Sequence, residues 1–198
     1  MKESGARPGQ WVALPGAGGG LGHLSVQYAN AMGLRVLAVD TGKEKEELCK
    51  KLGAEAFVDF KTSKDVIAEV KEITDGGPHA VIVMAASAKP YEDALKMVRT
   101  KGTVVAVGLP AKAIMGADVF DTVTRSLTIK GSYVYAPLKN EFDLIRGNRA
   151  DTAEALDFLA RGKVKVFYKT RGLSELPQVY EEMEKGTIAG RIVLDTSK

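Results

Sequence analysis

The chain has 198 residues, of which 45% are hydrophobic and 27% charged, proportions that suit one large domain or one domain with part of a second. Lys and Arg number 28 against 25 Asp and Glu, and this net charge of +3 is spread along the chain, which disfavours nucleic acid and anionic membrane as partners. A single cysteine excludes an internal disulfide, and no apolar run reaches membrane-spanning length, so we expect a soluble, cytoplasmic protein.

From Trp11 onward, short β-rich runs alternate with amphipathic stretches, the pattern of a parallel sheet with helices on both faces. Six strands are predicted, at residues 11–14, 36–39, 56–58, 81–84, 104–107 and 127–129. Helices are predicted between them, at residues 21–32, 43–52, 63–74 and 91–98. Ser63 is the expected N-cap of the third helix, and Pro90 suits the first turn of the fourth.

After the sixth strand the βαβ rhythm ends. Residues 135–149 combine Pro137, charged residues and a Gly-Asn pair, and predict a long loop with one helical turn through Leu138, Phe142 and Ile145. A helix at 152–161, a strand at 164–168, a helix at 175–185 and a strand at 191–194 are expected beyond it. This tail resembles part of another sheet that needs partners.

A glycine-rich loop, Pro15-Gly16-Ala17-Gly18-Gly19-Gly20-Leu21-Gly22, follows the first strand. Glycines there let the backbone approach a pyrophosphate while the first helix directs its N–H groups and positive dipole end at the anion. Read as Ala17-x-Gly19-x-x-Gly22, the loop has alanine in the first place of the G-x-G-x-x-G pattern. Tight turns and linkers also use glycine, so the preceding strand and following helix strengthen the interpretation.

The second strand ends in Asp40, at about the 20-residue distance at which dinucleotide-binding folds place an acid for the ribose hydroxyls. A carboxylate there would repel a 2′-phosphate, and Thr41-Gly42 follow where NADP-binding proteins often have arginine, so NAD is favoured. A turn or helix-cap role for Asp40 is the alternative. S-adenosylmethionine enzymes use a similar loop and acid, so these two features leave that class open.

Several stretches closely resemble zinc-dependent medium-chain alcohol dehydrogenases of the fungal tetrameric type. They are residues 16–24, 107–110, 129–134, 147–152 and 180–198. The resemblance covers nearly the whole chain and implies an α/β fold with a Rossmann doubly wound, six-stranded parallel sheet, followed by the returning end of a catalytic domain. The domain boundaries it implies are 1–162 for NAD binding and 163–198 for the C-terminal segment.

The resemblance also implies cofactor contacts, residue by residue. Gly19, Gly20, Leu21 and Gly22 would hold the pyrophosphate, with Arg191 pairing with a phosphate. Asp40 and Lys45 would bind the adenosine ribose, and Phe60 would line the adenine side. The positions expected around the nicotinamide half are Val107, Leu109, Ser132 and Val134. Each also has a plain alternative, since the valines suit a strand core, Lys45 a solvated helix face and Phe60 ordinary packing.

Zinc is expected for this family, where it binds the alcohol oxygen as a Lewis acid, but its ligands belong to an amino-terminal domain. In this chain the candidate ligands Cys49, His23 and His79 lie on different predicted elements without ligand spacing, so we expect no metal site. His23 departs from the family, in which a small residue is expected. The resemblance therefore implies a truncated, NAD-binding portion of an alcohol dehydrogenase that is inactive alone.

A second departure is an insertion at 135–146, directly after Val134, beside the strand that pairs across the family's dimer interface. It is interpreted as a partner-binding loop, an inserted surface loop or a gene-model artefact. The sixth strand also supports a second function, in which the chain is a non-catalytic partner that forms a homodimer or associates with a full-length dehydrogenase.

Overall fold

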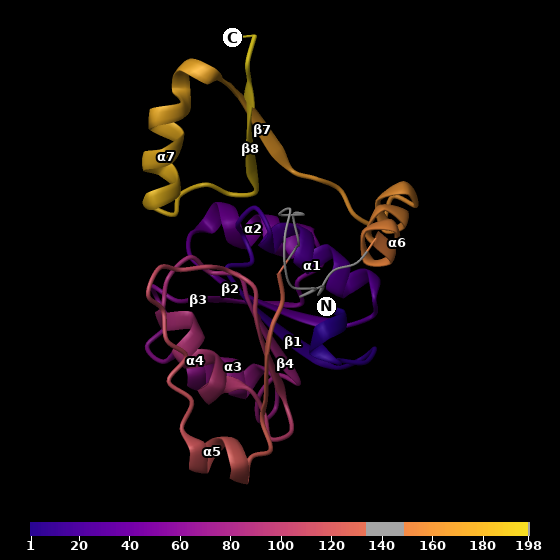
Figure 1. The fold of residues 1–198 in the computed structure, drawn as a ribbon, viewed down its shortest axis with the longest axis vertical. Helices are drawn as coiled ribbons and strands as arrows, with labels where there is room; N and C mark the ends of the chain where they lie inside the picture. Colours follow the sequence, from indigo (N-terminus) through magenta and orange to yellow (C-terminus); the bar gives the residue numbers. More distant parts are fainter. Residues whose placement is uncertain (134–148, 198) are drawn as a thin grey trace, which may run out of the picture.

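The computed structural model describes residues 1–133 and 149–197, in which six parallel strands form one sheet in the order β3-β2-β1-β4-β5-β6 (Figure 1). After a short 3-10 helix at Lys2–Ser4, the elements are β1 (Trp11–Pro15), α1 (Gly22–Ala31), β2 (Arg35–Asp40), α2 (Lys43–Lys51), β3 (Ala56–Asp59), α3 (Val66–Ile73), β4 (Ala80–Val83), α4 (Lys89–Met97), β5 (Thr103–Ala106), α5 (Val119–Thr124) and β6 (Thr128–Gly131). The predicted doubly wound sheet is confirmed. Its strand order reverses between β1 and β4, the place where such folds form a ligand crevice.

The central strands are buried on both faces because helices cover both sides of the sheet. Trp11 and Ala13 of β1 pack in a core with residues of α3 and α4, whereas Val12 and Leu14 pack with residues of α1 and α2. Figure 1 shows these two helix pairs on opposite sides of the strands. Burial on both faces explains why the strands are continuous apolar runs in the sequence.

The N-cap predicted for the third helix is wrong, because the helix begins two residues later than expected. Asp65, not Ser63, is the N-cap of α3, and its carboxylate accepts a hydrogen bond from the Ala68 N–H at 3.0 Å. The Ser63 hydroxyl is buried and has no hydrogen-bond partner among the described residues. A carboxylate at the positive end of a helix also gains from the helix dipole, which favours Asp65 over a serine. Pro90 lies in the first turn of α4, as expected.

The tail contains α6 (Arg149–Ala160), β7 (Tyr168–Gly172), a 3-10 helix at Leu173–Glu175, α7 (Leu176–Glu184) and β8 (Arg191–Asp195). Strands β7 and β8 pair in parallel as a separate two-stranded sheet, which projects from the larger one (Figure 1). The strand predicted at 164–168 is wrong, since β7 begins only at Tyr168. The preceding backbone instead donates from Lys165 and Phe167 to the side chains of Gln27 and His23 on α1.

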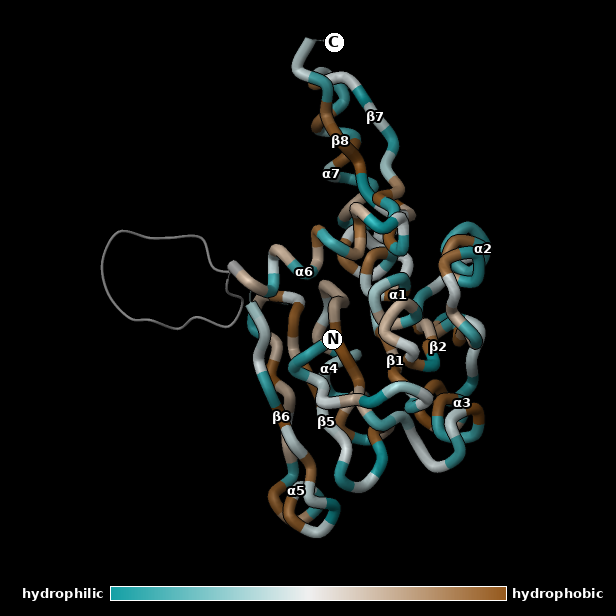
Figure 2. The backbone as a smooth tube through the Cα atoms, turned by 90° about the vertical axis from the view of Figure 1, so that its right-hand side faces the viewer, coloured by the Kyte–Doolittle hydropathy of each residue, from teal (hydrophilic) through white to brown (hydrophobic). Residues whose placement is uncertain are grey.

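Helix α5 has no counterpart in the sequence prediction. It lies at the amino end of the outer strand β6, where Figure 2 shows a hydrophobic stretch at the end of the molecule opposite the tail. Val119, Phe120 and Val123 are 75%, 77% and 69% exposed. The predicted helical turn and the insertion at 135–146 lie outside the described residues. No helix in the described part of the chain is long and apolar enough to cross a membrane.

Candidate nucleotide-binding site

The loop between β1 and α1 contains two glycines whose replacement would displace backbone. Gly16 has φ +87°, and a Cβ there would lie 2.9 Å from the backbone nitrogen of Ala85. A Cβ on Gly22 would lie 2.0 Å from the Gly16 carbonyl oxygen. The close packing expected of the last glycine is therefore present, whereas the tight turn belongs to Gly16, one residue before the Ala17 of the predicted pattern.

The tip of the loop presents backbone donors at the start of α1. Gly19 and Gly20 are partly exposed and Leu21 is 50% exposed. Leu21 is the N-cap and supplies no side-chain cap. Within the described residues, the backbone N–H groups of Gly20 and Leu21 have no hydrogen-bond partner. Unpaired N–H groups at the positive end of a helix are suited to an anion.

Asp40 ends β2 directly below this loop and is only 4% exposed. Its Oδ2 accepts the Gly18 N–H at 2.9 Å, and its Oδ1 accepts the Thr41 N–H at 2.9 Å and the Lys45 Nζ at 2.8 Å. A carboxylate has about four lone-pair sites, so these three donors leave one for a hydroxyl group. Asp40 thus combines a structural role in the loop with capacity for a ligand hydrogen bond.

Lys45 packs against Gly18 of the loop and pairs with Asp40, a role that the sequence did not reveal. The lysine is 9% exposed, and its stem lies 2.7 Å from the position of a Cβ on Gly18. Any side chain at Gly18 would therefore displace Lys45 from Asp40. The solvated position considered for Lys45 is wrong, because the buried ammonium pairs with a buried carboxylate.

Arg191 reaches the loop from the tail. It begins β8, and its guanidinium lies 2.9 Å from the position of a Cβ on Gly20. The neighbouring Gly190 N–H donates to the Gly18 carbonyl at 2.8 Å. The tail therefore brings a fixed positive charge to the same loop tip that carries the free N–H groups, an arrangement suited to an anion.

The remaining candidates follow the carboxyl ends of other strands along the same edge. Phe60 follows β3 and is 49% exposed, and Leu109 follows β5 and is 78% exposed. Val107 and Ser132 are half-buried and held by backbone bonds to β4 and β5 respectively. Val134 lies outside the described residues. Because the six strands are parallel, Phe60, Val107, Leu109 and Ser132 share one sheet edge with the glycine loop.

The three candidate metal ligands lie apart. His23 is on α1, Cys49 is on α2, and His79 precedes β4. Burial raises the pKa of the Cys49 thiol to about 12, which keeps it protonated at neutral pH. In residues 1–133 and 149–197, no three His, Cys, Asp or Glu side chains are grouped as a metal site would require. The described donor set does not fit the zinc expected for the family.

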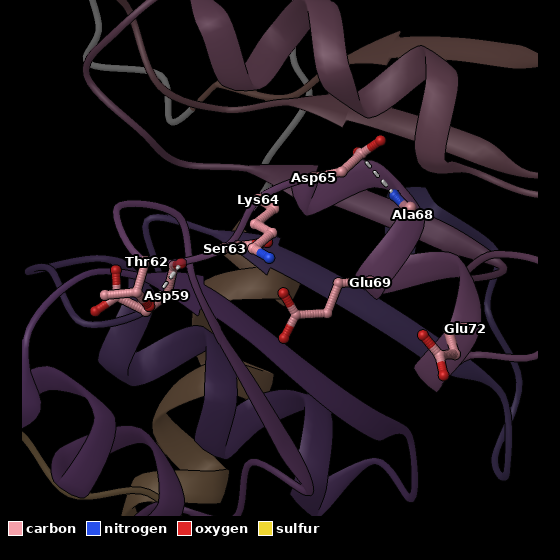
Figure 3. A pocket seen from close by; sticks show the side chains of 8 residues that line it. All are labelled: Asp59, Thr62, Ser63, Lys64, Asp65, Ala68, Glu69 and Glu72. Atoms are coloured by element: carbon pink, nitrogen blue, oxygen red, sulfur yellow. Dashed lines mark hydrogen bonds between the residues drawn. The ribbon is translucent and has the colours of Figure 1, made fainter.

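A separate hollow with a volume of about 440 Å³ lies between the end of β3 and α3 (Figure 3). Its lining residues are Asp59, Thr62, Ser63, Lys64, Asp65, Ala68, Glu69 and Glu72. Four carboxylates against one ammonium make this hollow a poor site for phosphate. The glycine loop, with its free N–H groups and Arg191, suits a phosphate better than this hollow does.

Comparisons with known proteins identify the family of the chain. A family model described as zinc-binding dehydrogenase matches residues 20–161. Alcohol dehydrogenase 1 of Neurospora crassa is 58% identical over the whole chain, and the alcohol dehydrogenase of Schizosaccharomyces pombe is 50% identical. In both cases the chain covers 53% of the relative, so it spans about half the length of these proteins.

Solved structures share the fold. The alcohol dehydrogenase from the archaeon Aeropyrum pernix superposes with a TM-score of 0.82 at 28% identity, covering 98% of this chain and 52% of that one. The acetophenone reductase from Geotrichum candidum, solved in complex with NAD, gives a TM-score of 0.75 at 26% identity, covering 100% of this chain and 52% of that one.

Proposed function

The chain belongs to the zinc-binding dehydrogenase family, and from that premise we propose that it binds NAD along the carboxyl edge of its six-stranded sheet. The observation that carries the proposal is the placement of free loop N–H groups, the Arg191 guanidinium and the Asp40 carboxylate around the ends of β1 and β2. The first two suit a pyrophosphate, and the third suits a ribose. The pyrophosphate contacts in this proposal are Gly19, Gly20, Leu21 and Gly22.

The preference for NAD over NADP rests on Asp40. Its carboxylate is buried and accepts three hydrogen bonds, and a remaining lone-pair site can accept a ribose hydroxyl hydrogen. A 2′-phosphate would meet this negative charge at close range. Lys45 positions the carboxylate, and Phe60 offers an exposed ring for the adenine side. The NAD complex of the acetophenone reductase supports this cofactor by similarity.

The nicotinamide half would then lie over the strand ends that Val107, Leu109 and Ser132 follow. Val134 is included in this proposal on the sequence resemblance alone. NAD supplies a hydride acceptor when bound, and alcohols are the proposed substrate class because the fungal relatives are alcohol dehydrogenases. We assign no step to zinc, because the described residues do not fit it. Residues 1–162 are proposed as the NAD-binding domain and 163–198 as part of a second domain, which the separate β7–β8 sheet supports.

The test is a calorimetric titration of the purified chain with NAD, repeated in the presence of excess S-adenosylmethionine. We expect a single NAD site that S-adenosylmethionine leaves unchanged. Binding of S-adenosylmethionine without binding of NAD would replace the dehydrogenase assignment with a methyltransferase. In a parallel assay, the chain with zinc, NAD and ethanol is expected to form no NADH by itself, and clear turnover would contradict this part of the proposal.

A second function, association with a copy of itself or with a full-length dehydrogenase, is favoured by the apolar surface of α5 at the amino end of the outer strand β6. Val119, Phe120 and Val123 expose most of their surface, and a contiguous exposed apolar patch is typical of an interaction site. Figure 2 shows the hydrophobic backbone stretch of α5. Sedimentation of the chain, alone and mixed with a full-length fungal dehydrogenase, should reveal a complex that Phe120→Asp removes. Tyr180→Asp on the distant α7, which is also exposed, is the control. A monomer in both conditions would contradict this function.

A further inference from the structure

We propose that His23 is a positioning residue that holds the pyrophosphate-binding loop in shape and links it to the tail. The inference rests on the proposed NAD site and names a residue that the cofactor need not touch. His23 is the second residue of α1 and is completely buried. Its Nδ1 lies 3.0 Å from the Gly19 carbonyl oxygen, and its Nε2 lies 3.2 Å from the Phe167 backbone nitrogen.

The neighbours of His23 determine which ring nitrogen carries the hydrogen. The Phe167 amide can only donate, so Nε2 must provide the acceptor lone pair. In a neutral imidazole the hydrogen is then on Nδ1, where it is donated to the Gly19 carbonyl. Both nitrogens are satisfied only in this tautomer, and a doubly protonated ring would direct a hydrogen at the Phe167 N–H.

Burial, with a smaller contribution from Arg191, keeps the His23 ring neutral. The positive charge of Arg191 on β8 disfavours protonation of the His23 ring. The Phe167 ring packs at right angles to His23, and the Lys51 ammonium lies 5.5 Å from the centre of that Phe167 ring. Burial, together with Arg191, lowers the pKa of His23 below its ordinary value of 6.5. The tautomer required by the hydrogen bonds is thus the form present at neutral pH.

The hydrogen bond to Gly19 sets the direction of a loop donor. The Gly19 carbonyl accepts both the His23 Nδ1–H and the His23 backbone N–H, each at 3.0 Å, so two donors hold it toward the helix. No peptide bond among the described residues is cis, and in a trans peptide the next N–H points away from the carbonyl. His23 therefore directs the Gly20 N–H outward, toward the expected pyrophosphate.

Two isosteric substitutions separate the bonds of His23. Asparagine places an amide donor near the position of Nδ1, so His23→Asn can keep the bond to Gly19, whereas His23→Gln places an acceptor near Nε2 and keeps only the bond to Phe167. Gln27 is the matched control, since it lies one turn further along α1 and binds the backbone of Lys165. Its amide also donates to the His23 backbone carbonyl, a bond that the His23 variants keep, and it does not touch the loop. Gln27→Leu thus removes the hydrogen bonds between α1 and the Lys165 backbone, and so loosens the tail without changing the bond to Gly19.

The experiment is an NMR titration of the full chain and these three variants with ADP and with adenosine, which has no phosphate. We expect His23→Gln to weaken ADP binding about fivefold, the effect of one neutral hydrogen bond, while adenosine binding is unchanged. His23→Asn and Gln27→Leu should keep the ADP affinity of the unaltered chain. Equal ADP affinities for the unaltered chain and His23→Gln would overturn the inference, as would equal losses in His23→Gln and Gln27→Leu or a parallel loss of adenosine.

A second measurement reads the tautomer without any ligand. The chain has only two histidines, so the nitrogen-15 signals of His23 are identified by their loss in His23→Gln. A protonated Nδ1 and an unprotonated Nε2 are expected at pH 7.5, and the reverse tautomer overturns the inference. An unaltered chain that binds neither NAD nor ADP would refute the proposed function, whereas a bound nucleotide with unaffected variants refutes the role of His23 alone.

Discussion

The buried ion pair beneath the glycine loop yields a prediction about stability that needs no cofactor. The Asp40 and Lys45 side chains are 6% and 11% exposed, so water screens their charges poorly. Removal of one partner leaves the other charge buried without compensation. We therefore expect Lys45→Met and Asp40→Asn both to lower the free energy of unfolding well beyond the effect of a surface ion pair.

The size of each loss follows from the hydrogen bonds that remain. After Lys45→Met, the Asp40 carboxylate still accepts the Gly18 and Thr41 N–H groups, so the loss is expected at about 3 kcal/mol, the lower end for a broken buried pair. After Asp40→Asn, the Lys45 ammonium loses its buried counter-charge, and the new amide NH₂ meets the Gly18 N–H donor. That loss is expected to approach about 5 kcal/mol.

Urea unfolding at pH 7.5 measures these losses as shifts in midpoint at constant slope. The double variant should lose less than the sum of the single losses, with a coupling of about 2 kcal/mol. Lys50→Met is the matched control, because Lys50 pairs with Glu46 on the exposed side of the same helix, and it should change stability by at most about 0.5 kcal/mol. A similarly small effect for Lys45→Met would refute the reasoning.

Three further predictions concern the packing and protonation of buried groups. Gly22→Ala should lower the free energy of unfolding by about 3 kcal/mol, because its Cβ would lie 2.0 Å from a backbone oxygen. Gly19→Ala, whose Cβ would lie 3.5 Å from its nearest atom, should lower it by at most about 0.5 kcal/mol. Equal urea midpoints for the two variants would contradict this. Burial raises the pKa of Cys49 to about 12, so a thiol reagent at pH 8 should label it only as the chain unfolds, and rapid labelling of the folded chain would count against its burial. Burial lowers the pKa of both His23 and His79, so below the ordinary histidine value of 6.5 the unfolded chain binds more protons than the folded chain. The free energy of unfolding should therefore be highest above pH 6.5 and fall on acidification. A free energy of unfolding that does not change from pH 7.5 to 5.5 would disprove the shifts.

The sheet was predictable from the sequence because its strands are buried on both faces. Runs such as Val36 to Val39 are apolar without interruption, and the glycines and acids at their ends mark the edge where ligands bind. The candidate acid Asp40 was predicted from its place at the end of such a strand. Its partner Lys45 did not, because a lysine near the start of a charged helix is typical of a solvated face, and only the fold reveals that its stem lies against Gly18.

The tail was less predictable because its contacts are long-range and polar. Residues 164–167 have the apolar alternation of a strand, yet their backbone donors are taken by Gln27 and His23 on α1. No local pattern identifies such partners. The role of His23 had one sequence signal, a large polar residue at a helix start where a small one was expected, but its two hydrogen bonds required the folded chain.

The most direct test of the account is cofactor discrimination at Asp40. NAD and NADP are titrated calorimetrically into the unaltered chain and into Asp40→Ala, under conditions in which both proteins are folded. We predict that the unaltered chain prefers NAD, and that Asp40→Ala weakens NAD binding while improving NADP binding, because the freed Lys45 ammonium can meet a 2′-phosphate. Unchanged affinities for both cofactors would contradict the assignment of this site.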